Sequence, residues 1–367
     1  MVSGERNFTF IKFIKMRITK YFLHIILAAG ACIMLFSACS KKNTPPDYNS
    51  DKTTLGKLID SLTKVYTTTA EGNKPGNYAI GAKTQLKAAL DLAGQVKTGN
   101  KFTQEDVNNT YNNLLLAAQQ FSTKLIQEVS VANLVAFWKF NGNAIDSSGH
   151  GNHGTLITGY TGSSAATAVD GGVLPQPVAD RFGRAGMAYD FNNAATIEVP
   201  YSASLNPQNF TISLWVKRHT TNANNYMVSL NRWNGFKFQL QNNNFLFLTI
   251  HADNGYHDVD DAPGTIPQDI WTHAAVSYTS GTMKFYINGA LVKTVAVSGV
   301  PLTLSSPVNL AIGNELPKDA YNVTDPNDPN YFYGGDFFIG SLDDIRLYNT
   351  ALTDAEILSI YTIEQSL

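Results

Sequence analysis

Residues 210–217 read Phe-Thr-Ile-Ser-Leu-Trp-Val-Lys, in which apolar and polar side chains largely alternate. Successive side chains of a strand point to opposite faces, so a period of two predicts a half-buried β-strand. Four further phrases read as strands or as the turns that flank them: 140–154, 271–278, 284–289 and 340–349. Short strands separated by turn residues are typical of an antiparallel β-sandwich. The last two-thirds of the chain is therefore predicted to be mainly β.

A helical segment is predicted ahead of this sandwich, over residues 53–128. Three runs carry apolar residues at the i, i+3, i+4 spacing of a helix face. The first run contains Leu55, Leu58, Ile59 and Leu62, the second lies within 77–96, and the third extends from Val107 to Leu125. Thr103 and Asp106 resemble a capping box at the start of the third run. Because the breaks between the runs are short, we expect an antiparallel three-helix bundle.

The first 38 residues read as a secretory signal. Arg17 and Lys20 precede an apolar stretch of 16 residues, 21–36, which is shorter than the roughly 20 residues of a spanning helix. The stretch ends in Phe36-Ser-Ala-Cys39, which resembles a bacterial lipobox, although Phe36 stands where that pattern prefers Leu. We therefore expect lipidation of Cys39 and a polar tether over 39–52; an ordinary signal peptide or an uncleaved anchor is the alternative.

Charge and cysteine content narrow the function classes. The chain holds 27 Lys/Arg and 29 Asp/Glu, of which residues 1–38 contain five and one, so the mature protein has 22 against 28, a net charge of −6. Binding to nucleic acid is not expected from such a balance. The two cysteines are Cys32 and Cys39, so a mature chain starting at Cys39 can form no internal disulfide.

The strand phrases resemble, in their order, the laminin-G-like jelly roll of the concanavalin A-like lectin/glucanase superfamily. The resemblance covers residues 134–361 and is carried by the phrases above together with 187–191 and 197–200. It implies a jelly-roll β-sandwich domain over 133–367. The phrase Gly72-Asn-Lys-Pro-Gly-Asn-Tyr-Ala-Ile-Gly-Ala-Lys-Thr-Gln-Leu86 resembles the FIVAR-type helical modules of bacterial surface proteins, which implies either a spacer or a sugar-binding unit.

The resemblance also implies a structural Ca²⁺ ion between the 146–154 turn and the last strand. Its ligands would be Asp146, an oxygen such as that of Asn152, and Asp343 or Asp344. Ca²⁺ takes six to eight oxygen ligands, which such a turn can supply. The alternative is a plain Gly/Asn turn with solvated acids. His150 and His153 lie in the same turn, but no cysteine or third clustered histidine accompanies them, so zinc is not expected.

Aromatic residues in polar segments suggest a sugar-binding rim, because a pyranose stacks its C–H face on an aromatic ring while its hydroxyls bond to polar groups. Two such segments are the turn around residue 233 and the acidic loop 251–261, and a third lies at the end of the long excursion 314–336. The candidate ligand-binding residues are Arg232, Trp233, Asn234, Tyr256, His257, Tyr331 and Tyr333. Simple surface exposure of these aromatics is the alternative.

No catalytic constellation accompanies these candidates. Glycosidases of the resembled superfamily carry a Glu-x-Asp-x-Glu strand, since hydrolysis needs two carboxyl groups across one bond. Between residues 133 and 351 the only glutamates are Glu198 and Glu315, which are far apart in the sequence. We therefore predict a non-enzymatic, outer-membrane lipoprotein, on the cell surface or the periplasmic face, that binds a polysaccharide or glycan. The alternatives are an adhesive module that binds an envelope protein, or an atypical glycoside hydrolase.

Overall fold

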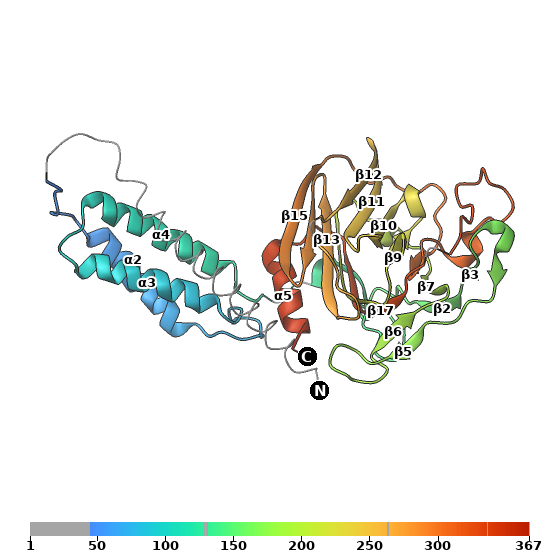
Figure 1. Ribbon diagram of the computed structural model, residues 1–367, viewed down its shortest axis with the longest axis horizontal. Coiled ribbons are helices and arrows are strands. Elements are labelled where there is room, and N and C mark those ends of the chain that lie inside the picture. Colours follow the sequence, from blue (N-terminus) through green and yellow to red (C-terminus); the bar gives the residue numbers. More distant parts are fainter. Residues whose placement is uncertain (1–44, 128, 130, 263, 336, 367) are drawn as a thin grey trace, which may run out of the picture.

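A computed structural model describes residues 45–127, 129, 131–262, 264–335 and 337–366. An elongated helical segment lies at one end of the molecule and a β-sandwich at the other (Figure 1). The predicted signal, the lipidation site Cys39 and the start of the tether lie outside the described residues. Among the residues described, no helix is long and apolar enough to span a membrane.

Three helices form the described part of the helical segment: α2 (Thr53–Thr68), α3 (Ala82–Thr98) and α4 (Gln104–Ser122). Their apolar faces meet in one cluster that contains Leu55, Leu86, Leu90, Ala93, Val107, Leu114 and Phe121. The predicted capping box is confirmed: the Thr103 hydroxyl accepts from the Asp106 amide, and the Asp106 carboxylate accepts from the Thr103 amide. The second helix begins at Ala82 rather than 77, because Gly81 has a left-handed φ of 89°.

Two antiparallel sheets form the sandwich. Within the described residues, the first sheet has the order β15 (Ala290–Val297), β14 (Gly281–Ile287), β13 (Thr272–Thr279), β8 (Phe210–Arg218), β17 (Gly340–Tyr348), β6 (Ala188–Phe191) and β5 (Gln176–Val178), with β1 (Leu134–Trp138) paired to β17. The second has the order β12 (Gly255–Asp260), β11 (Leu246–Ala252), β10 (Phe236–Gln241), β9 (Asn224–Leu230), β16 (Leu310–Ile312), β7 (Ala195–Val199) and β2 (Thr155–Thr158). A short ladder joins β3 (Tyr160–Thr161) and β4 (Val169–Asp170).

The core lies between the two sheets, and period-two alternation places it there. On β10, Phe236, Phe238 and Leu240 point inward into the main apolar cluster, while Lys237 and Gln239 point outward. Neighbouring strands supply matching inward residues, such as Leu248 opposite Phe238. The predicted jelly-roll-like, mainly β antiparallel sandwich with helices ahead of it is confirmed.

A fourth described helix, α5 (Asp354–Glu364), covers the outer face of the first sheet and lies between that sheet and the helical segment (Figure 1). Thr353 and Glu356 form a capping box at its start. A second apolar cluster fills the space beneath it and contains Leu134, Phe137, Ala275, Tyr286, Tyr348, Leu352, Ile357 and Ile360. The outer face of the first sheet is thus covered by α5.

Candidate functional site

An aromatic rim stands beside the outer face of the second sheet, and we define it as Trp233, Tyr331 and Tyr333. Trp233 lies in η4 (Arg232–Asn234), the tight turn between β9 and β10, and its ring centroid is 6.1 Å from that of Tyr333. The Tyr331 and Tyr333 rings meet edge to face at 5.2 Å. Trp233 is 38% exposed and Tyr333 is 59% exposed. The structure therefore brings together three of the predicted ligand residues from segments about a hundred residues apart.

Arg232 supports this rim from beneath instead of joining it. Its side chain is 1% exposed, and it forms an ion pair with Glu315 while donating to the carbonyl oxygens of Pro329 and Tyr331 at 3.2 and 2.9 Å. Its guanidinium also lies 4.9 Å from the Trp233 ring centroid. Arg232 was predicted as a ligand contact from its sequence neighbourhood; in the structure it holds the 329–333 backbone against the η4 turn.

The outer face of β10 continues the site. Lys237 and Gln239 alternate with the core phenylalanines and are buried, and the Lys237 ammonium lies 5.2 Å from the Trp233 ring centroid. The Gln239 amide donates to Asn224 Oδ1 at 2.9 Å, whereas its Oε1 atom is buried with no hydrogen-bond partner. Buried polar atoms are nearly always paired with protein or water. The unpaired Oε1 is therefore an acceptor that a buried water molecule can satisfy.

Tyr256 and His257 lie on β12, next to the rim but outside it. The Tyr256 ring stacks on His251 with centroids 4.0 Å apart, and His257 Nε2 is 2.8 Å from Asn254 Oδ1. The backbone amide of His251 donates to the carbonyl of Gly235, directly after the η4 turn. The hairpin of β11 and β12 is thus hydrogen-bonded to the turn that carries Trp233. Asn234, the remaining predicted residue, donates its amide to the Asn231 carbonyl within the turn at 2.9 Å.

The predicted cation turn is built from hydrogen bonds. Asp146 accepts from the amides of Phe137, Ser148 and Asn152, and from the Ser148 hydroxyl, at 2.8–3.0 Å. Burial opposes ionisation of Asp146, but these four donors hold its pKa below the usual value. The Asn152 side-chain oxygen accepts from Ser202 at 3.0 Å. Each predicted ligand oxygen in this turn therefore has a protein donor.

The acidic pair on the last strand binds an arginine. Arg181 Nη1 is 2.8 Å from Asp343 Oδ2, and its Nη2 is 2.8 Å from Asp344 Oδ2. Nε and Nη2 of the same guanidinium also donate to the carbonyl oxygen of Glu364, in α5. Burial is the main cause that raises the pKa of both aspartates, and each also has a neighbouring carboxylate that adds to the rise. Arg181 supplies the opposing positive charge.

This donor set does not fit the Ca²⁺ site that the resemblance implies. Amides and a guanidinium occupy the carboxylate oxygens that a cation would need, and a cation would have to displace them. Among the residues that the structure describes, no group of three or more His, Cys, Asp or Glu could hold a metal ion. His153 accepts through Nδ1 from the Asp146 amide at 3.2 Å, so it belongs to the same turn.

The two sandwich glutamates are likewise engaged by protein donors. Glu198 accepts from the Lys318 amide at 2.8 Å, and Glu315 is paired with Arg232. His273 is buried beside Ser213, whose hydroxyl lies 2.8 Å from its Nε2, as expected for a packed sheet residue. Both glutamates thus accept hydrogen bonds from protein groups.

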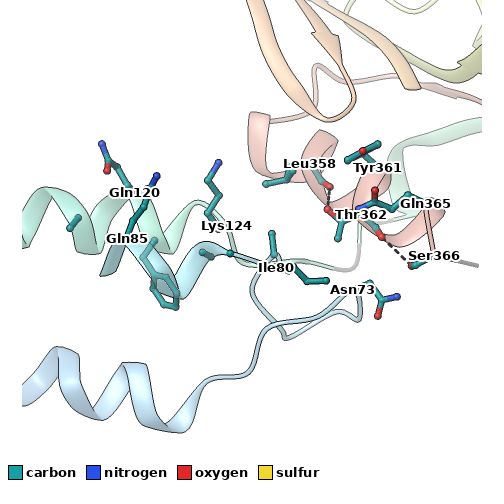
Figure 2. A pocket seen from close by; sticks show the side chains of 15 residues that line it. Asn73, Ile80, Gln85, Gln120, Lys124, Leu358, Tyr361, Thr362, Gln365 and Ser366 are labelled. Carbon is teal, nitrogen blue, oxygen red and sulfur yellow. Dashed lines mark hydrogen bonds between the residues drawn. The ribbon is translucent and has the colours of Figure 1, made fainter. Parts of the chain in front are cut away.

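A separate cavity of about 610 Å³ lies where the helical segment meets α5. Figure 2 shows Ile80 and Lys124 of the helical segment on one side and Leu358, Tyr361 and Thr362 of α5 on the other. The Gln127 amide donates to the Ser359 hydroxyl at 2.9 Å at this junction. The helical segment is thus joined to the sandwich through α5, away from the second sheet that carries the aromatic rim.

Sequence reasoning did not single out Arg181, Lys237 or Gln239. The alternation Phe236-Lys-Phe-Gln-Leu240 could have identified Lys237 and Gln239 as one polar face of a strand. Nothing local marks Arg181, because its partners lie 162 and 163 residues further along the chain.

Comparison with known families indicates the same class of fold as the structure does. Residues 191–358 match the family model Laminin_G_3, described as the concanavalin A-like lectin/glucanases superfamily, so this segment is similar to domains of that superfamily. A comparison with curated proteins finds no match.

Several solved structures share the fold at low identity. Domain 4 of AbnA, a GH43 extracellular arabinanase from Geobacillus stearothermophilus, solved in complex with arabinotriose, is 23% identical with a TM-score of 0.44, over 62% of this chain and 98% of that one. The binding domain of Paraclostridial Mosquitocidal Protein 1 is 20% identical with a TM-score of 0.42, over 63% and 52%. A botulinum neurotoxin type C structure, from work on cell entry through two ganglioside molecules, is 14% identical with a TM-score of 0.42, over 63% and 51%. The chain spans about half the length of these two toxin chains, and the likeness is one of fold alone.

Proposed function

We propose that the sandwich binds a glycan noncovalently, on the aromatic rim and the adjoining outer face of the second sheet. The observation that carries the proposal is the exposed Trp233–Tyr333 pair, which a buried Arg232–Glu315 ion pair holds in place. An exposed aromatic pair needs a rigid support to act as a binding platform, because ordering it at the moment of binding would cost affinity.

The chemistry around the platform suits a sugar. A pyranose ring can lie on Trp233 while its hydroxyls reach polar groups at the ring edge. Polar groups adjoin the ring, with the Lys237 ammonium 5.2 Å from the Trp233 ring centroid. Engagement of Glu198 and Glu315 by protein donors favours binding without hydrolysis, and this supports a binding module over a glycosidase.

The remaining parts of the proposal concern anchoring. Cys39 would carry two acyl chains, since a single chain gives only weak membrane attachment. Residues 39–52 would lift the body from the outer membrane, and the helical segment would act as a spacer that presents the sandwich outward. The position of the helical segment against α5, away from the aromatic rim, supports the spacer role.

A glycan array tests the binding function. The purified full chain, compared with Trp233→Ala, should bind at least one class of polysaccharide, and the variant should lose most of that signal. Tyr48→Ala is the matched control, because Tyr48 is an exposed aromatic outside the sandwich. No binding to any polysaccharide, together with capture of an envelope protein, would instead favour the adhesive module.

A further inference from the structure

Two long excursions from the sandwich pack against each other beside the aromatic rim. The Tyr160 ring lies 6.5 Å from that of Tyr321 and 6.0 Å from that of Phe332, centroid to centroid. Lys318 Nζ is 2.6 Å from Asp170 Oδ1. These two excursions, segments 159–183 and 314–336, are therefore braced by side-chain contacts, although loops of this length are often functional or disordered.

Glycine brings the two backbones close together at one point. A Cβ on Gly334, whose φ is 136°, would lie 2.6 Å from the carbonyl oxygen of Ser163. A Cβ on Gly162 would likewise lie 2.3 Å from the Thr167 carbonyl oxygen. A larger residue at position 334 would force the two segments apart, so their present spacing depends on Gly334, whereas Gly162 allows the tight turn within segment 159–183.

A cavity of about 430 Å³ opens between the two segments, and we call it the loop cavity. Its lining consists of Thr161, Gly162, Ser163, Asn193, Tyr333, Gly334, Gly335 and Phe337. The volume falls within the range of about 300–1,000 Å³ that is usual for small-molecule sites. Tyr333 belongs both to this lining and to the aromatic rim, so the two features are contiguous.

The lining has the chemistry of a site for an uncharged sugar. It offers three hydroxyls, one carboxamide and two aromatic rings, one of which carries one of the hydroxyls, and none of these eight residues carries a charge. Hydroxyl and amide groups pair with sugar hydroxyls, and aromatic rings pack on the C–H face. The glycines leave backbone amides and carbonyls open to close approach. A carboxylated or sulfated sugar would find no countercharge among these residues.

We propose that the loop cavity is a second subsite that receives one neutral sugar unit of the glycan bound at the aromatic rim. This inference rests on the proposed function. An oligosaccharide lying across Trp233 and Tyr333 would direct its next unit over the shared Tyr333 ring into the loop cavity. Affinity should therefore increase with chain length until both places are filled, and neutral glycans should be preferred to anionic ones.

The test is calorimetric titration of the full chain with neutral arabino-, xylo-, cello- and malto-oligosaccharides of two to six units. Ser163→Trp would fill the loop cavity from an exposed position, and Ala166→Trp, exposed in the same loop but outside the lining, is the matched control. Ser163→Trp should lower the affinity for the longest ligand at least tenfold. It should leave the affinity for the shortest ligand that binds within twofold of the parent value. Ala166→Trp should change neither, and the melting temperature of both variants should match that of the parent.

Two results would contradict the proposed subsite, and they can be told apart. If Ser163→Trp binds every length as the parent does while Trp233→Ala is impaired, the aromatic rim binds glycan and the loop cavity does not. If the parent binds none of these ligands or any polysaccharide, the proposed function itself fails and the subsite fails with it.

Discussion

Arg181 and Asp343 lie 162 residues apart in the chain and form a buried ion pair between the first sheet and α5, with Nη1 2.8 Å from Oδ2. Asp344, the next residue of β17, binds the same guanidinium. Consecutive strand residues normally point to opposite faces, but β17 has an irregularity between Asp343 and Arg346, and Asp344 has a left-handed φ of 46°. The bulge turns both carboxylates toward Arg181 at the point where β17 passes from pairing with β6 to pairing with β1.

Arg181→Ala should destabilise the sandwich strongly. Removing one partner of a buried ion pair leaves uncompensated charge, at a cost of about 3–5 kcal/mol. Lys284→Ala is the control, because Lys284 also pairs with an aspartate, Asp354, whose side chain is 52% exposed, and it should cost less than about 1 kcal/mol. Denaturant unfolding of both variants measures the difference in the free energy of unfolding. Equal decreases in the two variants would contradict the stabilising role of the Arg181 ion pairs.

Removal of divalent cations should leave the melting temperature unchanged. A ligand that binds only the folded state raises stability by mass action, so chelation would lower the melting point if Ca²⁺ were bound. Hydrogen-bond donors already occupy Asp146 and Asp343. Thermal scans with chelator and with millimolar Ca²⁺ should therefore superimpose, whereas a clear rise with Ca²⁺ would restore the predicted cation site.

His273 should make the protein sensitive to acid. Burial lowers its pKa to about 3, with the charges of Arg346 and Arg181 adding to the effect, and the Trp215 and Tyr361 rings enclose it. Because the folded-state pKa lies below the usual 6.5, the unfolded chain takes up a proton first. The contribution of neutral His273 to the free energy of unfolding is therefore fully present above pH 6.5. It is lost as the pH falls toward 3, at about 1.4 kcal/mol per pH unit.

His273→Gln should remove that part of the pH dependence, since the amide can still meet the Ser213 hydroxyl but cannot titrate. The raised pKa values of Asp343 and Asp344 act in the opposite sense, with stability present at low pH and lost as the pH rises, and they are common to both proteins. The difference between the two unfolding curves therefore isolates His273. Parallel curves between pH 6.5 and 4 would exclude this role.

Cys39→Ser should abolish lipid attachment. Metabolic labelling with a fatty acid in a bacterial host should mark the parent chain and not the variant, and the variant should move from the membrane to the soluble fraction. Cys32→Ser is the control, because Cys32 lies inside the apolar stretch ahead of the lipobox. Labelling that survives Cys39→Ser would rule out this anchor.

The sequence predicts local structure better than long-range contacts. The strand at 210–217 and the capping box at Thr103 depend on neighbouring residues, and the structure confirms them. Trp233 and Tyr333 were selected separately as exposed aromatics, and the fold brings them together. Arg232 was predicted as a ligand contact because nothing near it reveals its partner Glu315, 83 residues further along the chain. Long-range ion pairs of this kind follow from the topology and cannot be read from spacing.

The most direct test of glycan binding is calorimetric titration of the best polysaccharide from the array against the full chain and Trp233→Ala/Tyr333→Ala. Rigid aromatic anchors dominate such interfaces, so the double variant should bind at least about a hundredfold more weakly, which corresponds to about 2.8 kcal/mol. Its melting temperature should stay close to that of the parent, since both side chains are exposed. Unchanged affinity in the double variant would contradict the aromatic rim as the glycan site.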